Sequence, residues 1–273
     1  MNGDKISLST VLYDGYKGVD IKVDELIRHI VKVGYKNIEV SGWNMMKNWD
    51  FKELVNKTKD AGISILSVHC VHHSELDMRS YEKDVFSEFH QKFYKLLEDV
   101  GLGGRVVVEH PPLSENQLDV SLQLLDILRQ INKKYNFTIV IENMPNPKRE
   151  EQLRVLKKLL QEPDIYYCHD INHAAMAGFN PFDFLDFLPK LRNIHVVDTN
   201  PLIPFGDGVA PGLGIVPIEE ILSKIIKGGY KGSFTLEIYG FERSLNEVLR
   251  ICSKAISYIN VKYSKNLDIL LEG

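Results

Sequence analysis

A single repeat most constrains the fold: short apolar segments rich in β-branched residues alternate with longer amphipathic segments along the whole chain. A buried strand followed by a helix is the unit from which parallel sheets are built, and we expect eight such units here. The expected strands are KISLSTVL (5–12), NIEVS (37–41), SILSVHC (64–70), RVVVEH (105–110), FTIVIE (137–142), IYYCHD (165–170), NIHVVD (193–198) and FTLEIY (234–239).

Polar residues at the ends of these strands distinguish between an open sheet and a closed barrel. An open sheet would spread them along one edge, whereas a (β/α)₈ barrel brings all its strand ends to one mouth, where the chemistry of such barrels takes place. No GxGxxG follows the first strand, so the dinucleotide-binding open sheet lacks its main signal. We therefore predict an α/β fold, a (β/α)₈ TIM barrel, as a single domain over residues 1–273. The strand-end residues are Glu39, His69, His110, Glu142, Asp170, His195 and Glu237.

Composition and charge narrow the class of protein. The chain is 44% hydrophobic and 26% charged, which is typical of a globular protein, and its net charge of −4 argues against a general nucleic-acid binder. Its three cysteines lack CxxC spacing and are odd in number, so they read as free intracellular thiols. No signal-peptide pattern opens the chain and no long apolar run follows, so we expect a cytoplasmic protein without membrane association.

The segment IVIENMPNP (139–147) is an apolar strand that finishes on the carboxylate of Glu142. Burying an ionised carboxylate without a partner is costly, so Glu142 is expected at the mouth or beside a cation. With Asp170, His195 and Glu237 it would supply three carboxylates and one imidazole. One such residue alone would more often be a cap or a solvent-facing group. Together they predict a site for one divalent cation, with Mn²⁺, Mg²⁺ and Co²⁺ suited to the oxygen-rich set and Zn²⁺ also compatible. Asp198 is a candidate for a supporting position behind this set.

Several motifs give the chain a resemblance to a known family. They are IEN (141–143), DINHAAMAGFNP (170–181), the strand with His195, PGLGIVPI (211–218) and LEIYG (236–240). Over nearly its whole length the chain resembles the xylose-isomerase-like TIM barrels, which include sugar isomerases and epimerases and endonuclease IV. The resemblance implies metal ligation by Glu142, Asp170, His195 and Glu237. It also implies a substrate contact or a second-metal role for His173.

One branch of this family isomerises or epimerises sugars. There, one cation polarises the carbonyl of an open-chain sugar, and two carboxylates on opposite faces pass a proton. The resemblance implies Glu142 and Glu237 as that pair, with His173 and Glu39 orienting substrate oxygens. The chain departs from many ketose epimerases near Pro201, where they carry an arginine, and it lacks the lysine-bearing metal motifs of true xylose isomerases.

The endonuclease branch hydrolyses phosphodiesters with a cluster of zinc ions. The matching positions make a second metal site at His69, His110 and Glu142 plausible. The segment FGDGVAPGLG places Gly206 and Gly208 where that branch has an Asp-x-His pair, so the third zinc would lack ligands.

We therefore expect a divalent-metal-dependent isomerase or epimerase of a small sugar or a related hydroxy-carbonyl compound. The alternative is an endonuclease IV-like zinc phosphodiesterase with a reduced metal cluster, acting on nucleic acid. A binding barrel without catalysis is a third reading. Members of the group often form homo-oligomers, and the sequence pattern does not require one.

Overall fold

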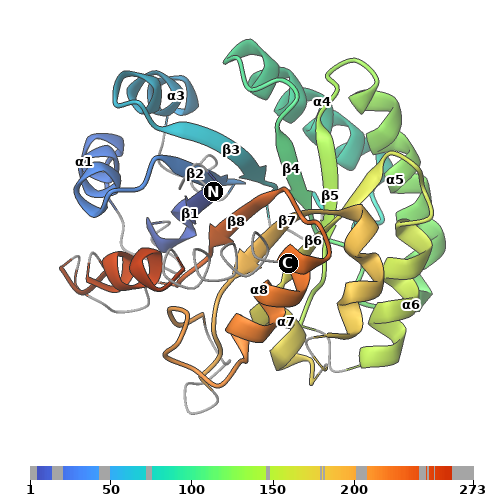
Figure 1. The fold of residues 1–273 in the computed structure, drawn as a ribbon. Coiled ribbons are helices and arrows are strands. Elements are labelled where there is room, and N and C mark those ends of the chain that lie inside the picture. Colours follow the sequence, from blue (N-terminus) through green and yellow to red (C-terminus); the bar gives the residue numbers. More distant parts are fainter. Residues whose placement is uncertain are drawn as a thin grey trace.

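Eight parallel strands form a closed barrel in chain order, from β1 to β8, with β1 also paired to β8 (Figure 1). The computed structural model describes residues 5–13, 21–42, 50–71, 76–145, 148–178, 180, 182–200, 208–239, 244, 246–248 and 250–259. This confirms the predicted α/β class and the (β/α)₈ architecture. The strands are β1 (Ile6–Ser9), β2 (Asn37–Ser41), β3 (Ser64–His69), β4 (Val106–Glu109), β5 (Thr138–Glu142), β6 (Ile165–Asp170), β7 (Leu191–Val196) and β8 (Ser233–Leu236).

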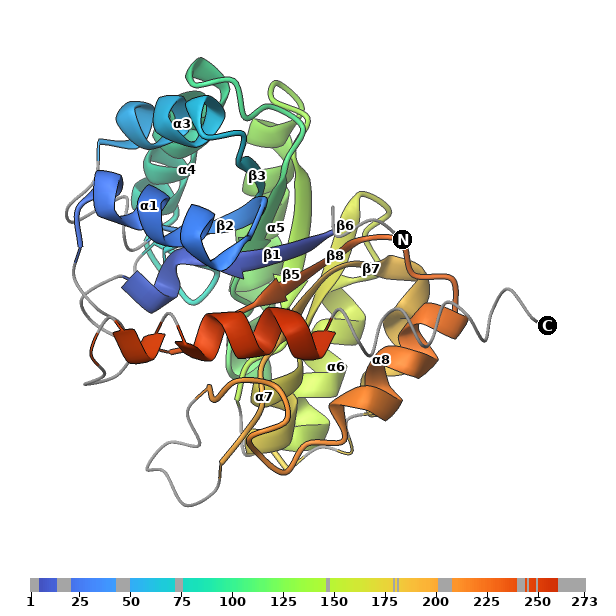
Figure 2. The same ribbon diagram turned by 60° about the vertical axis from the view of Figure 1, so that its left-hand side comes forward.

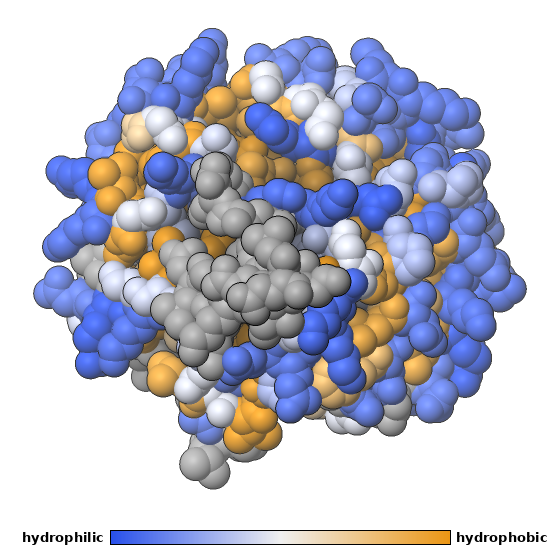
Figure 3. Space-filling view, in the orientation of Figure 1, coloured by the Kyte–Doolittle hydropathy of each residue, from blue (hydrophilic) through white to orange (hydrophobic). Residues whose placement is uncertain are grey.

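Helices surround the barrel on its outside (Figures 1 and 2). Each buries one apolar stripe; in α1 the stripe includes Val23, Leu26 and Ile30, at the spacing of one helix face. Hydrophilic residues dominate the periphery of the face in Figure 3, as expected for the outer faces of these helices. The helices are α1 (Val23–Val33), α3 (Phe51–Asp60), α4 (Lys83–Asp99), α5 (Leu118–Asn132), α6 (Arg149–Leu159), α7 (Ile171–Met176) and α8 (Ile218–Lys227), with helical residues 246–248 and 250–259 after β8.

The barrel interior has two chemically different halves. Val108, Val140 and Cys168 form a buried apolar cluster with Val106 and Tyr166 against it, and we call this the apolar half. Around β7, β8, β1, β2 and β3 the interior is instead a hydrogen-bonded network, which we call the polar half. Its members are Ser7, Glu39, Ser67, Asn193 and Thr235, all fully buried.

One connection differs from a regular βα unit. Between β6 and β7 the chain forms the short helix α7 and then a 3-10 helix, η3 (Asp183–Lys190), in place of one long amphipathic helix. Pro189 lies inside η3, where its ring opposes a continuous α-helix. Two other 3-10 segments, η1 (Thr10–Tyr13) and η2 (Glu115–Gln117), follow β1 and precede α5. Pro201 and Gly206, which bear on the family comparison, lie outside the described residues. Within the described ranges, no helix combines the length and the apolar character needed to cross a bilayer.

Candidate metal centre

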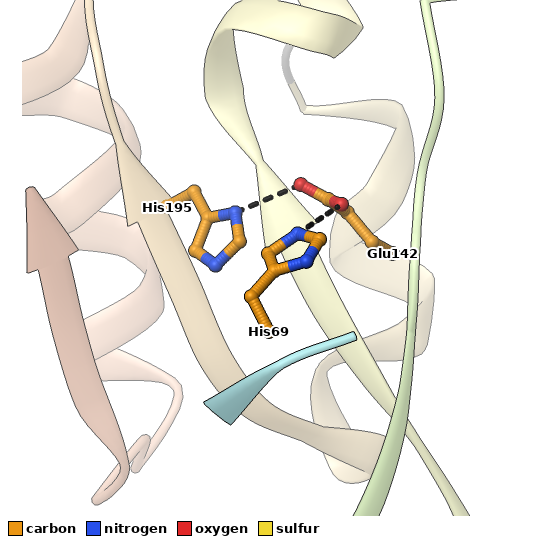
Figure 4. A group of neighbouring side chains, drawn as sticks. All are labelled: His69, Glu142 and His195. Atoms are coloured by element: carbon orange, nitrogen blue, oxygen red, sulfur yellow. Dashed lines mark hydrogen bonds and ion pairs between the residues drawn. The ribbon is translucent and has the colours of Figure 1, made fainter. Parts of the chain in front are cut away.

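Glu142, the last residue of β5, lies at the centre of the polar cluster at the barrel mouth. Its Oε1 is 2.8 Å from Nδ1 of His195 on β7, and its Oε2 is 3.2 Å from Nε2 of His69 at the end of β3. Figure 4 shows both rings turned toward this carboxylate. His110, directly after β4, brings its Nε2 to 3.2 Å from the same Oε2. Glu142 itself is fully buried, so these rings neutralise a charge that water does not reach.

The four predicted ligands meet at one point. Glu142, Asp170, His195 and Glu237 each offer an atom within 4.8 Å of the others. His195 Nδ1 lies at the centre of this group, 3.1 Å from Glu237 Oε2 and 3.6 Å from Asp170 Oδ2. The register of the sheet explains why these side chains meet. Asp170, the last residue of β6, pairs with His195 of β7, so the two residues lie at the same height in the barrel. The structure therefore brings together the residues that the sequence singled out.

The charges of this cluster balance only if protons or a cation lie between them. Burial opposes ionisation of Glu142, but His195 and the hydrogen bonds of His110 and His69 hold its pKa well below the usual range. Burial raises the pKa of Glu237, although His195 beside it acts in the opposite direction. Burial lowers the pKa of His69, yet its hydrogen bond to Glu142 and the nearby carboxylates raise that pKa to about 9. The raised pKa of His69 favours its charged form, which offsets part of the carboxylate charge as a divalent cation would.

Backbone contacts orient two of these side chains. His173 on α7 has its Nδ1 3.0 Å from the carbonyl of Asn143; a carbonyl can only accept, so Nδ1 carries the hydrogen and Nε2 is free to bind a ligand. Asp170 is the N-cap of α7 and accepts from His173 N–H through Oδ1 at 2.6 Å. Asn143 accepts from Asp170 N–H and donates to its carbonyl, both at 2.8 Å, which fixes the end of β6.

Glu39 lies deeper than its predicted position at a strand end. It is the third of the five residues of β2, is fully buried, and faces the side of the His195 ring opposite Glu142. Its Oε1 is 3.2 Å from His195 Nε2, and its Oε2 accepts from Ser67 at 2.6 Å and from Asn193 at 2.9 Å. A ring nitrogen that donates to a carboxylate leaves the other nitrogen oriented for a metal. Glu39 thus has the contacts of a residue that positions His195.

The donor set fits a divalent cation. Among the described residues, Asp170 Oδ2 is buried within the cluster and accepts no hydrogen bond, which is unusual for a carboxylate oxygen. Three carboxylates and one imidazole match the ligand preferences of Mn²⁺, Mg²⁺ and Co²⁺, and Zn²⁺ accepts the same donors. His69 and His110 contact Glu142 through Oε2, whereas His195 contacts Oε1, and His69 forms a second candidate metal group with Glu142 and His195.

The sequence singled out Asp198 as a supporting residue but did not show what it contacts. Asp198 accepts hydrogen bonds from the backbone N–H groups of Gly212, Gly214 and Val216 at 2.9, 2.9 and 3.0 Å, so it orders the loop after β7. A side chain at Gly214 would put its Cβ 2.3 Å from Asp198 Oδ1. The sequence signal was the pair of an aspartate beyond the seventh strand and a glycine-rich loop, but only the fold shows that they meet.

The fold and the cluster at its mouth define a (β/α)₈ barrel with a candidate metal centre built from strand ends. The family model for xylose isomerase-like TIM barrels matches residues 15–255. The chain belongs to this family.

Solved structures with this fold differ widely from the chain in sequence. A D-tagatose 3-epimerase-like protein is similar with a TM-score of 0.76 at 20% identity, covering 97% of this chain and 99% of that one. A D-allulose 3-epimerase from Methylomonas sp. gives 0.73 at 15% identity, over 95% and 97% of the two chains. A probable 3-DHS dehydratase from Bacillus anthracis gives 0.70 at 16% identity, over 94% and 98%. The search of curated proteins gave no match. At these identities the likeness establishes the fold.

Proposed function

We propose that the protein is a divalent-metal-dependent isomerase or epimerase of a small sugar or a related hydroxy-carbonyl compound, acting in carbohydrate metabolism in the cytoplasm. The observation that carries the proposal is the placement of two carboxylates from different strands around His195 Nδ1. Glu142 on β5 lies 2.8 Å from that nitrogen, and Glu237 after β8 lies 3.1 Å from it. The solved epimerases with the same fold support this choice of reaction.

Glu142, Asp170, His195 and Glu237 would hold the cation. When bound there, a divalent ion polarises a substrate carbonyl and makes the neighbouring C–H more acidic. Glu142 and Glu237 are the two carboxylates placed to pass the proton, one as general base and the other as general acid. His173 donates through Nδ1, so its Nε2 is placed to orient a substrate oxygen. Glu39 fixes the orientation of the His195 ring through its contact with Nε2.

The test is proton exchange between substrate and heavy water. Metal-loaded protein incubated with tagatose, ribulose or allulose in D₂O should place deuterium on the carbon that changes configuration. Glu142→Gln and Glu237→Gln should each lower that exchange by about 10²- to 10⁴-fold, the usual contribution of a general acid or base. Glu162→Gln, which alters an outer ion pair with Arg129, is the matched control and should leave the exchange unchanged. Full exchange in both mouth variants would exclude the mechanism.

A second candidate function rests on the two histidines that contact Glu142 Oε2. His69 and His110 each lie 3.2 Å from Glu142 Oε2, as a pair for a second zinc ion would. A zinc phosphodiesterase related to endonuclease IV would need this pair. It predicts cleavage of an abasic-site DNA duplex by zinc-loaded protein and loss of cleavage in His110→Ala. If wild-type protein leaves this duplex intact but exchanges deuterium into a sugar, the isomerase proposal is supported and the phosphodiesterase proposal is excluded.

A further inference from the structure

A second cluster of metal-binding side chains lies outside the barrel, on the far side of the strands that carry His69 and His110. It contains Cys70, directly after β3, Glu109 at the end of β4, and His90 on α4. Their ligand atoms all lie within 4.8 Å of one another, and all three residues are buried. None of them takes part in the function proposed above. Figure 1 shows α4 on the outside of the barrel, alongside β4.

The tautomer of His90 leaves its second nitrogen facing a thiol and a carboxylate. His90 Nδ1 is 2.9 Å from the carbonyl of Phe86, so this nitrogen carries the hydrogen and donates it. In a neutral ring, Nε2 then has a lone pair, and it points at Glu109 Oε1 at 3.4 Å and at Cys70 Sγ at 3.8 Å. A histidine that donates one nitrogen to a carbonyl and turns the other to a thiol and a carboxylate has the orientation of a metal ligand.

The spacing of the ligand atoms matches the edges of a zinc tetrahedron. Zn–N and Zn–O bonds of about 2.0 Å and a Zn–S bond of about 2.3 Å put N and O about 3.3 Å apart and N and S about 3.5 Å apart. The corresponding distances here are 3.4 Å and 3.8 Å. The observed distances between ligand atoms would have to shorten by only a few tenths of an ångström to match those around a zinc ion.

Glu109 supplies an independent indication of a cation site. Its Oε2 is fully buried and has no hydrogen-bond partner within the described part of the chain. Oε1 lies close to His90 and accepts a long hydrogen bond from Tyr94 at 3.5 Å. A buried carboxylate oxygen without a donor is costly unless a cation is near it. The two oxygens of one carboxylate are closer together than two corners of a zinc tetrahedron, so Glu109 fills one corner and the three residues supply three corners.

We propose that Cys70, His90 and Glu109 form a structural zinc site that ties α4 to the ends of β3 and β4. Cys70 follows His69, and Glu109 precedes His110. Cys70 N–H also donates to the Val108 carbonyl at 2.8 Å, which joins the two strand ends directly. An ion at this point braces the two segments that aim His69 and His110 at Glu142. The proposal does not depend on the reaction at the mouth.

Cobalt provides the test, because a cysteine thiolate bound to Co²⁺ absorbs in the near ultraviolet, whereas oxygen and imidazole ligands do not give this band. Reduced full-length protein freed of metal by chelation is titrated with Co²⁺. We expect a thiolate band whose final intensity corresponds to one thiolate-bound Co²⁺ per chain and which disappears when Zn²⁺, which binds more tightly, is added. The band should persist in Glu142→Ala, which removes the central carboxylate of the mouth.

Cysteine variants locate the sulfur ligand. Cys70→Ser should abolish the band. Cys252→Ser is the matched control, because this thiol is also buried but lies next to Tyr35, whose hydroxyl donates to the Cys252 carbonyl at 3.0 Å. A band that survives Cys70→Ser and is lost in Cys168→Ser would place the sulfur inside the barrel and overturn the proposal. The absence of any band in wild-type protein would overturn it as well.

If Cys70→Ser does not fold, the sulfur ligand can still be tested in protein that keeps Cys70, His90 and Glu109. X-ray absorption of zinc-loaded Glu142→Ala protein should show one sulfur neighbour at about 2.3 Å from zinc. A zinc environment of nitrogen and oxygen alone would show that Cys70 binds no metal.

Discussion

The two halves of the barrel interior are filled by different kinds of contact. In the apolar half, Val108, Val140 and Cys168 fill the space between β4, β5 and β6 by van der Waals contact, as branched side chains do in most such barrels. In the polar half a chain of hydrogen bonds fills the corresponding space. Ser7 contacts Thr235 at 2.8 Å, and Thr235 donates to Asn193 at 3.2 Å.

This difference separates two ways of holding a functional side chain. Glu142 rises from the apolar half, and the histidines around it set its charge. His195 rises from the polar half, where Glu39 contacts its Nε2 at 3.2 Å and Asn193 in turn donates to Glu39 at 2.9 Å. The orientation of the His195 ring is thus determined by hydrogen bonds, whereas the backbone and packing determine where Glu142 lies. Substitutions in the two halves should therefore have different consequences.

The largest effect is expected from removing the carboxylate that anchors the polar half. Glu39→Leu leaves His195, Ser67 and Asn193 without their shared acceptor in a fully buried place. We expect a loss of about 3–5 kcal/mol in the free energy of unfolding, as when one partner of a buried charged pair is removed. Urea unfolding followed by circular dichroism measures it.

Glu39→Gln separates positioning from folding. The amide keeps the shape and one acceptor oxygen, so the fold should survive while the affinity for the mouth cation falls by about 10- to 100-fold, as for other groups behind a metal ligand. Calorimetric titration with Mn²⁺ measures that affinity. An unchanged affinity would mean that Glu39 does not position His195.

The next effect concerns the cation, which would join the two halves. Asp170 and Glu142 end strands of the apolar half, whereas His195 lies on β7 and Glu237 directly follows β8, both in the polar half. An ion that binds only the folded chain should stabilise it by about 2.7 kcal/mol at one hundred times its dissociation constant. The melting temperature should rise with added Mn²⁺ and fall back with chelator. In Glu142→Ala the rise should vanish, and an equal rise there would locate the stabilising ion elsewhere.

In the apolar half, Val140→Ala tests packing alone. Val140 is fully buried next to Val108 and Cys168, so the loss of two methyl groups leaves a cavity. We expect a cost of about 2 kcal/mol in unfolding free energy and no change in cation affinity. The control is Val31→Ala on α1, because Val31 is 54% exposed. If Val140→Ala weakened cation binding as much as Glu39→Gln, the proposed division between the halves would be wrong.

The sequence predicted what depends on periodicity and missed what depends on tertiary contact. Eight alternating segments were enough for the barrel, and strand ends were enough to select Glu142, Asp170, His195 and Glu237. The short α7 with η3 was missed, because a proline-containing segment carries no clear helical period. Glu39 was placed too near the mouth, since the alternation of a strand gives the face of a residue and not its depth. The cluster of Cys70, His90 and Glu109 could not be predicted from the sequence, because a helix and two strands meet there only in the folded chain.

The smallest effect is expected at the far end of the polar network. Ser7→Ala removes one hydroxyl, at 2.8 Å from Thr235, and leaves the Thr235 hydroxyl still donating to Asn193. One hydrogen bond between neutral groups contributes about 1 kcal/mol to stability, so unfolding free energy should fall by about that amount. Because Asn193 keeps its contact with Glu39, cation affinity should stay within about twofold of wild type. A tenfold weaker affinity in this variant, measured by the same calorimetric titration, would mean that the whole chain of hydrogen bonds from Ser7 to His195 acts as one unit.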